Sequence, residues 1–269
     1  MLNTLHNPHP GLVDDRDILP VAATVQQKMD ALERTVTKSR FLLVQGPAGL
    51  GKTYTVGKGV RARPDYHQST FYTHSGNMTD RKLYDVLFDA SAPGCIVVLD
   101  DTDQTLMNNK ARSVLKGATG PDANGKYMCE WSTSNISHAR INIVGVPIPP
   151  SFEFHGSLFI ITNKPIDAMA KGTTAAAGDF AALVSRMRLF KCNFEPRAVY
   201  CYVWSHLPTV LQLHLPNDSR AHLELGHWFL LHFFKLRDQS FRSLINIIDI
   251  YKRDPRGWRD ECFFTLLDD

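Results

Sequence analysis

Cysteine is scarce in this sequence, and its few copies do not pair. The 269 residues include five cysteines with no CxxC spacing among them: Cys95, Cys129, Cys192, Cys201 and Cys262. Cysteines scattered in this way are typical of reduced thiols inside cells, and they do not form the framework of a small disulfide-rich domain or a zinc site. The pattern favours a reducing, intracellular environment.

Long apolar runs are also missing. No stretch approaches the roughly 20 apolar residues that cross a membrane. The N-terminus has acidic residues by Asp14 and no apolar core of signal-peptide length. We therefore expect a soluble, cytoplasmic protein with no membrane partner.

Neither sign of charge dominates. The formal net charge is +3, from 30 Lys and Arg against 27 Asp and Glu. This balance does not by itself argue for a nucleic-acid partner, although a local basic surface would still bind one. Hydrophobic residues at 43% and charged residues at 21% are values of a globular protein. The length fits one large α/β core and a smaller C-terminal domain.

A glycine-rich run organises the chain. Residues 46–53 read GPAGLGKT and directly follow the apolar residues 41–44. Glycines let successive N–H groups curl around a phosphate, and the next helix adds the positive end of its dipole. In this motif Lys52 reaches the β- and γ-phosphates, and the Thr53 hydroxyl holds Mg²⁺. The predicted nucleotide-binding residues are Gly46, Pro47, Ala48, Gly49, Leu50, Gly51, Lys52, Thr53 and Tyr54.

Two later apolar runs end in polar residues. The first precedes Asp100 and Asp101, and the second precedes Asn163. Uninterrupted apolar runs indicate strands buried in a parallel sheet, and such sheets bind ligands at the carboxyl ends of their strands. Asp100 fits a Mg²⁺ ligand, and Asp101 fits the acid that orients or deprotonates the attacking water. Asn163 positions water or caps a turn, and Asp103 is a supporting acid or a helix cap.

The remaining segments set the expected domain layout. Residues 1–20 read as an extended N-terminal arm or a disordered tail, residues 21–200 as the α/β core, and residues 201–269 as a C-terminal helical lid domain. Two extended stretches, 126–131 and 140–146, flank a polar segment. They predict a β-hairpin inserted at about 126–146.

The order of these features resembles an AAA+ ATPase over about residues 20–255. The resemblance makes residues 46–53 the Walker A loop of a P-loop NTPase and residues 96–101 its Walker B strand, with ATP and Mg²⁺ as cofactors. Asn163 matches sensor 1. Either Arg186 or Arg188 matches the arginine finger that enters the site of the next subunit. The resemblance therefore implies a homo-oligomer, a hexameric ring. The implied catalytic residues are Lys52, Asp101, Asn163, Arg186 and Arg242. Arg242 matches the sensor-2 arginine, and the alternative is a cation on a helix surface.

The predicted hairpin resembles the pre-sensor-1 β-hairpin of AAA+ helicases, including compact ATPases of bacteriophages. If a bacteriophage encodes the chain, its compartment is the cytoplasm of the bacterial host. The candidate nucleic-acid contacts are Lys126, His138 and Arg140. The alternative is an ordinary surface hairpin, because its tip has no aromatic or lysine cluster for a single strand.

Three functions follow from these features. The first is a DNA helicase or translocase of replication or recombination, driven by ATP hydrolysis. The second is a protein-remodelling or helicase-loading ATPase that acts on a replication protein partner. The third is a slow nucleotide switch, because Asp101 stands where the resemblance places a glutamate, and aspartate is one methylene shorter.

Overall fold

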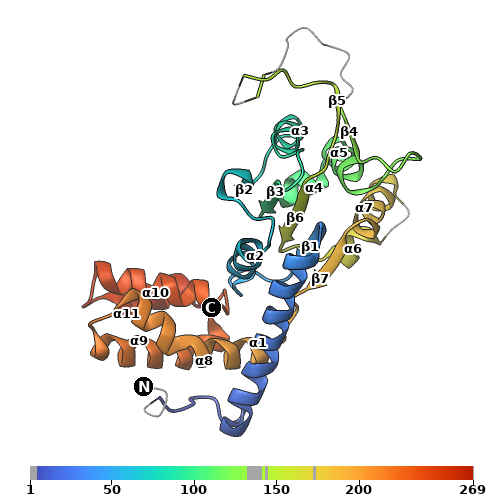
Figure 1. The fold of residues 1–269 in the computed structure, drawn as a ribbon. Coiled ribbons are helices and arrows are strands. Elements are labelled where there is room, and N and C mark those ends of the chain that lie inside the picture. Colours follow the sequence, from blue (N-terminus) through green and yellow to red (C-terminus); the bar gives the residue numbers. More distant parts are fainter. Residues whose placement is uncertain (1–4, 132–140, 143–144, 172–173, 269) are drawn as a thin grey trace. The chain divides into compact units, whose positions relative to one another are not determined.

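The computed structural model describes residues 5–131, 141–142, 145–171 and 174–268 of the chain (Figure 1). The chain forms two compact units. We call them the helical unit, which consists of Met1–Asp30, Ala48–Gly51 and Asn193–Asp269, and the α/β unit, which consists of Ala31–Pro47 and Lys52–Cys192. Each unit has its own hydrophobic core.

A five-stranded sheet with the order β2-β3-β6-β1-β7 forms the centre of the α/β unit (Figure 1). Every neighbouring pair of these strands is parallel. The strands are β1 (Phe41–Gln45), β2 (Phe71–Ser75), β3 (Ile96–Asp100), β6 (Ser157–Thr162) and β7 (Arg188–Lys191). The predicted α/β class with a parallel sheet is confirmed. The uninterrupted apolar runs of β3 and β6 are buried at all apolar positions, as strands covered on both faces require.

Helices cover this sheet. They are α2 (Lys52–Arg61), α3 (Asp80–Asp89), α4 (Asp103–Met107), α5 (Asn109–Thr119), α6 (Ile166–Ala170) and α7 (Ala175–Ser185), with a short 3₁₀ turn, η2, at Gln68–Thr70. Thr79 caps α3 by accepting a hydrogen bond from Lys82 N, and the Asn108 side chain caps α5. Such caps satisfy N–H groups that have no partner within the helix.

A small second sheet stands where the hairpin is predicted, and one of its two strands differs from the prediction. The strand β4 (Met128–Glu130) pairs antiparallel with β5 (Ser151–Glu153), with Cys129 opposite Phe152. The first predicted strand is therefore confirmed, but its expected partner, residues 140–146, is wrong. Phe152 is buried against the rings of Tyr84 and Phe88, and this burial selects the pairing.

In the segment that was expected to pair, the described residues bond to one another. Asn142 N donates to Val146 O at 2.8 Å, and Gly145 N donates to Asn142 O at 3.0 Å. Lys126 is exposed at the base of the β4–β5 hairpin, 3.9 Å from the Glu153 carboxylate. His138 and Arg140 lie outside the described residues.

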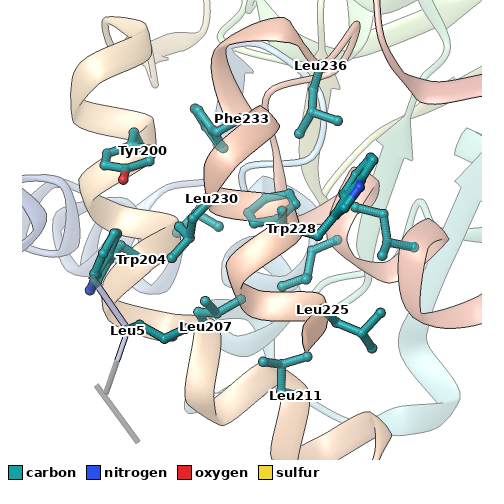
Figure 2. Packing of buried hydrophobic residues seen from close by; sticks show 14 of the residues in the cluster. Leu5, Tyr200, Trp204, Leu207, Leu211, Leu225, Trp228, Leu230, Phe233 and Leu236 are labelled. Atoms are coloured by element: carbon teal, nitrogen blue, oxygen red, sulfur yellow. The ribbon is translucent and has the colours of Figure 1, made fainter. Parts of the chain in front are cut away.

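The helical unit contains the first part of α1 (Asp15–Lys38) and a set of C-terminal helices. These are α8 (Pro196–His214), α9 (Ser219–His232), α10 (Phe241–Arg253) and α11 (Trp258–Leu266), with a 3₁₀ turn, η3, at Phe233–Lys235. Figure 2 shows buried side chains of α8 and α9 that form its core. Aromatic rings pack edge to face there: the Tyr200 and Phe233 centroids lie 5.2 Å apart, and those of Trp228 and Trp258 lie 5.7 Å apart.

Two predicted boundaries are wrong. The extended arm predicted for residues 1–20 is helical from Asp15, despite Pro20. Val13 and Ile18 of this segment are buried in the core of the helical unit, and this burial outweighs the hydrogen bond that a proline removes. The predicted boundary at 200/201 falls inside α8, and the C-terminal segment of the helical unit begins at Asn193 instead.

All five cysteines lie in the described part of the chain, are buried and form no disulfide. Burial raises the pKa of the Cys129 thiol to about 12. Across the described ranges, no helix combines the length and the apolar character that a membrane span requires.

Candidate nucleotide-binding site

The glycine-rich loop leaves the sheet at the end of β1, at its carboxyl edge. Gly46 has no room for a side chain, because a Cβ atom there would lie 2.7 Å from Cys192 O. Gly49 has a φ of 73°, in the left-handed region that favours glycine. A Cβ atom on Gly49 would also lie 2.0 Å from the Ser240 hydroxyl oxygen, within the helical unit. Leu50, the next residue, is buried in the core of that unit.

Lys52 begins α2, and its side chain is buried in the loop. The ammonium donates to Gly46 O at 2.8 Å, to Pro47 O at 2.5 Å and to the Asn163 side-chain oxygen at 2.9 Å. Its charge therefore lies at the positive end of a helix dipole, among N–H groups that the helix leaves without partners. This arrangement attracts phosphate.

Thr53 and Asp100 meet beside this cation. The Thr53 hydroxyl donates to Asp100 Oδ2 at 2.6 Å, which joins the first turn of α2 to the end of β3. Hydroxyl and carboxylate oxygens are ligands that Mg²⁺ accepts, together with water and phosphate oxygens. The two side chains fit the predicted magnesium site.

Asp101 has an unusual backbone. Among the described residues it is the one non-glycine residue with a positive φ, at 53°. This conformation costs most residues roughly 1–2 kcal/mol, and aspartate tolerates it better than most. The turn brings Asp101 Oδ1 to 2.6 Å from Asn163 Nδ2.

The Asn163 side chain therefore joins two predicted catalytic groups. Its oxygen accepts from Lys52, and its nitrogen donates to Asp101. The two contacts agree on the amide orientation, because a carboxylate only accepts and an ammonium only donates. In these two contacts the Asn163 amide bonds to other side chains and does not cap a turn. Of the other loop residues, Pro47 is exposed, Ala48 is half-buried and Tyr54 of α2 is 71% exposed.

The two candidate finger arginines lie at the other edge of the sheet. Arg188 begins β7 and is opposite Leu42 in β1, whereas the nucleotide loop follows the far end of β1. Arg186 is exposed just before β7, and its guanidinium donates to Lys116 O at 3.1 Å. Because the strands are parallel, neither arginine lies at the loop edge of its own sheet.

Arg242 is in the helical unit, at the start of α10. The Ser240 hydroxyl caps this helix by accepting from Arg242 N at 3.1 Å. The backbone of Gly49 belongs to the same unit and accepts from Phe241 N at 3.3 Å. The tertiary structure thus brings the predicted sensor-2 segment to one residue of the nucleotide loop.

Sequence reasoning missed Thr162. This last residue of β6 is fully buried, and its hydroxyl donates a hydrogen bond to Asp103. Asp103 thus accepts a bond from another strand end, in addition to starting α4. The only signal in the sequence is a hydroxyl residue between an apolar run and Asn163.

The strand order, the loop after β1 and the polar ends of β3 and β6 define the AAA+ ATPase fold, which this chain has. Crystal structures of NtrX from Brucella abortus are similar, with a TM-score of 0.52 and 15% identity both in complex with ATP and in complex with ADP. The match to the ATP complex covers 88% of this chain and 52% of that chain, and the match to the ADP complex covers 86% and 49%.

A distant homologue is the "Uncharacterized 36.7 kDa protein in nrdC-mobD intergenic region" of Enterobacteria phage T4. It is 25% identical over 224 residues, which cover 82% of this chain and 66% of that protein. The chain therefore spans about half of NtrX and just under two thirds of the phage protein. No family model matches the sequence.

Proposed function

We propose that this protein binds ATP with Mg²⁺ and hydrolyses it. The observation that carries the proposal is the Asn163 amide, which links Lys52 to Asp101 and so holds a phosphate-binding cation beside an acid. A structural neighbour that was crystallised with ATP and with ADP supports the choice of nucleotide.

Each group has a role in this proposal. The loop N–H groups and Lys52 bind the β- and γ-phosphates. Asp101 accepts the proton of the attacking water, and Asn163 fixes that acid and the water relative to the γ-phosphate. Thr53 and Asp100 would hold Mg²⁺, which when bound would neutralise charge on the phosphate oxygens.

Phosphate release by the purified protein tests this proposal. We expect release to require both ATP and Mg²⁺, and turnover per subunit to rise with protein concentration as the protein assembles. Absence of phosphate release at every protein concentration, with ATP and Mg²⁺ saturating, would contradict the proposed hydrolysis.

Arg186 is proposed to complete the site of a neighbouring subunit. Its position at the opposite sheet edge from Gly46 supports a role in trans. We expect Arg186→Ala to lower turnover by about 10³–10⁵, the range of known arginine fingers. Arg188→Ala tests the alternative, since that arginine is also exposed and two residues away; a loss of that size in this variant instead would make Arg188 the finger.

A mixing experiment separates a trans role from damage to the fold. Arg186→Ala keeps its own catalytic acid, and Asp101→Asn keeps its arginine. Mixed rings of two inactive variants therefore contain some sites with both groups, and we expect phosphate release to recover in the mixture. Without recovery in rings shown to be mixed, Arg186 is not the finger.

We further propose a ring, hexameric by analogy with this fold class, that uses ATP to move along or unwind DNA. The supporting features are the β4–β5 hairpin between α5 and β6 and the exposed Lys126 at its base. Single- or double-stranded DNA is then expected to stimulate phosphate release, with binding weakened by salt and by Lys126→Glu. If DNA changes neither binding nor turnover and a replication protein copurifies, the protein-remodelling or helicase-loading function replaces this one.

A further inference from the structure

We propose that Thr162 and Asp103 form a clamp that positions Asn163 against Asp101 during ATP hydrolysis. The inference rests on the proposed ATPase function. Thr162 immediately precedes Asn163 at the end of β6, and Asp103 follows Asp101 by two residues at the start of α4. The clamp therefore joins the two backbones that carry the proposed water-positioning groups.

The Thr162 hydroxyl is at the centre of this clamp. It donates its one proton to Asp103 Oδ1 and accepts a hydrogen bond from Lys164 N at 3.0 Å. The residues on both sides of Asn163 are thus tied to one buried oxygen. A hydroxyl supplies one donor and two acceptor positions, so a single side chain is able to make both bonds.

The acid side of the clamp is equally constrained. Asp100 O accepts from Gly76 N at 3.0 Å, and Thr102 O accepts from Leu106 N at 3.2 Å. Between these two anchored residues, Asp101 has its left-handed backbone. Because the residues on both sides of the turn are held, loss of the Asp103 contact leaves the turn formed and removes the side-chain bond between the start of α4 and the end of β6.

Catalysis needs this tie more than nucleotide binding does. Asn163 and Asp101 are exposed, and their 2.6 Å contact has little packing around it to hold it. A shift of about 1 Å in a reacting group costs up to about 100-fold in rate. Phosphate binding depends instead on the loop backbone and Lys52. Thr162 meets that loop through its backbone, since its carbonyl oxygen accepts from Gly46 N at 3.2 Å, and a side-chain substitution keeps this bond.

Thr162→Val tests the clamp, since it removes the hydroxyl and nearly keeps the shape. We expect kcat to fall about 10- to 100-fold, with KM for ATP and the Kd of a non-hydrolysable ATP analogue within about two-fold of the wild type. Thr162→Ser restores the hydroxyl, so we expect it to recover most of kcat. Combined with Asp103→Ala, Thr162→Val is expected to cost little more than the slower single variant, because both remove one contact.

Thr105→Val is the matched control. Thr105 is also a buried threonine and belongs to α4, but its hydroxyl bonds Met78 N at 3.1 Å and Met78 O at 3.0 Å, away from Asn163. We expect this variant to lower Tm as much as Thr162→Val does and to keep wild-type kcat.

The outcomes are distinct. Thr162→Val with wild-type kcat, or an equal loss of kcat in Thr105→Val, overturns the clamp and leaves the ATPase proposal standing. A wild-type protein that binds ATP without any turnover overturns the proposed function, and the clamp with it. Loss of kcat in Thr162→Val alone, with rescue by Thr162→Ser, supports both.

Discussion

Lys52→Ala is expected to weaken ATP binding by at least about 100-fold, equivalent to about 2.7 kcal/mol. The reason is the position of the ammonium, which is buried in the loop and bonded to Gly46 O and Pro47 O. The substitution removes the cation that would meet the phosphates and also two bonds that close the loop. Titration with a fluorescent ATP analogue measures the loss of binding, and phosphate release measures the loss of turnover.

Lys58→Ala is the control for this experiment. Lys58 is an exposed lysine of the same helix and forms an ion pair with Glu33 at 2.8 Å. Exposed ion pairs contribute roughly 0–1 kcal/mol to stability, so we expect both ATP binding and turnover to stay near wild type. ATP binding by Lys52→Ala equal to that of the control would show that nucleotides bind elsewhere.

Asp101→Asn is expected to lower phosphate release by about 10²–10⁴ and to leave ATP affinity within about two-fold. The substituted amide has nearly the same shape and also tolerates a positive φ, so the turn at 53° is preserved. Its oxygen still accepts from Asn163, but an amide does not take the proton of the attacking water. Single-turnover phosphate release with the same titration separates chemistry from binding.

The same variant decides between a motor and a slow switch. Aspartate is one methylene shorter than glutamate, so the attacking water has to lie closer to the end of β3 for Asp101 to act. Equal turnover in the wild type and in Asp101→Asn would show that this acid takes no part in hydrolysis. That result would favour the nucleotide switch and count against both kinds of motor.

Local features of this protein were predictable because short-range chemistry decides them. The glycines and Lys52 of the loop follow from how a backbone surrounds a phosphate, and the buried strands β3 and β6 follow from uninterrupted apolar runs. The rule that parallel sheets bind ligands at their carboxyl edge then predicted that Asp100, Asp101 and Asn163 would meet. Asn163 donates to Asp101 as that rule predicts, and Asp100 accepts from Thr53 of the loop.

The corrected features depend on contacts between distant parts of the chain. The partner of β4 is set by Phe152, which is buried beside Tyr84. Tyr84 precedes Phe152 by 68 positions in the sequence. Likewise, α1 begins before Pro20 because Val13 and Ile18 pack into a core built mainly from the C-terminal helices. The local sequence pattern predicts neither the strand pairing nor the start of α1. A hydrophobic residue indicates that its side chain will be buried, but it does not indicate which neighbour will cover that side chain.

By itself, therefore, the sequence determined that this chain has a parallel α/β core with a phosphate-binding loop, because periodicity and glycine spacing act over a few residues. The tertiary structure alone decided how the loop and the strand ends become one site. It folds Lys52 toward the Asn163 amide, turns Asp101 through a left-handed backbone and joins Thr162 to Asp103. Those contacts exist because β6 lies between β3 and β1 in the sheet, so the residues that follow these strands reach one another through their side chains.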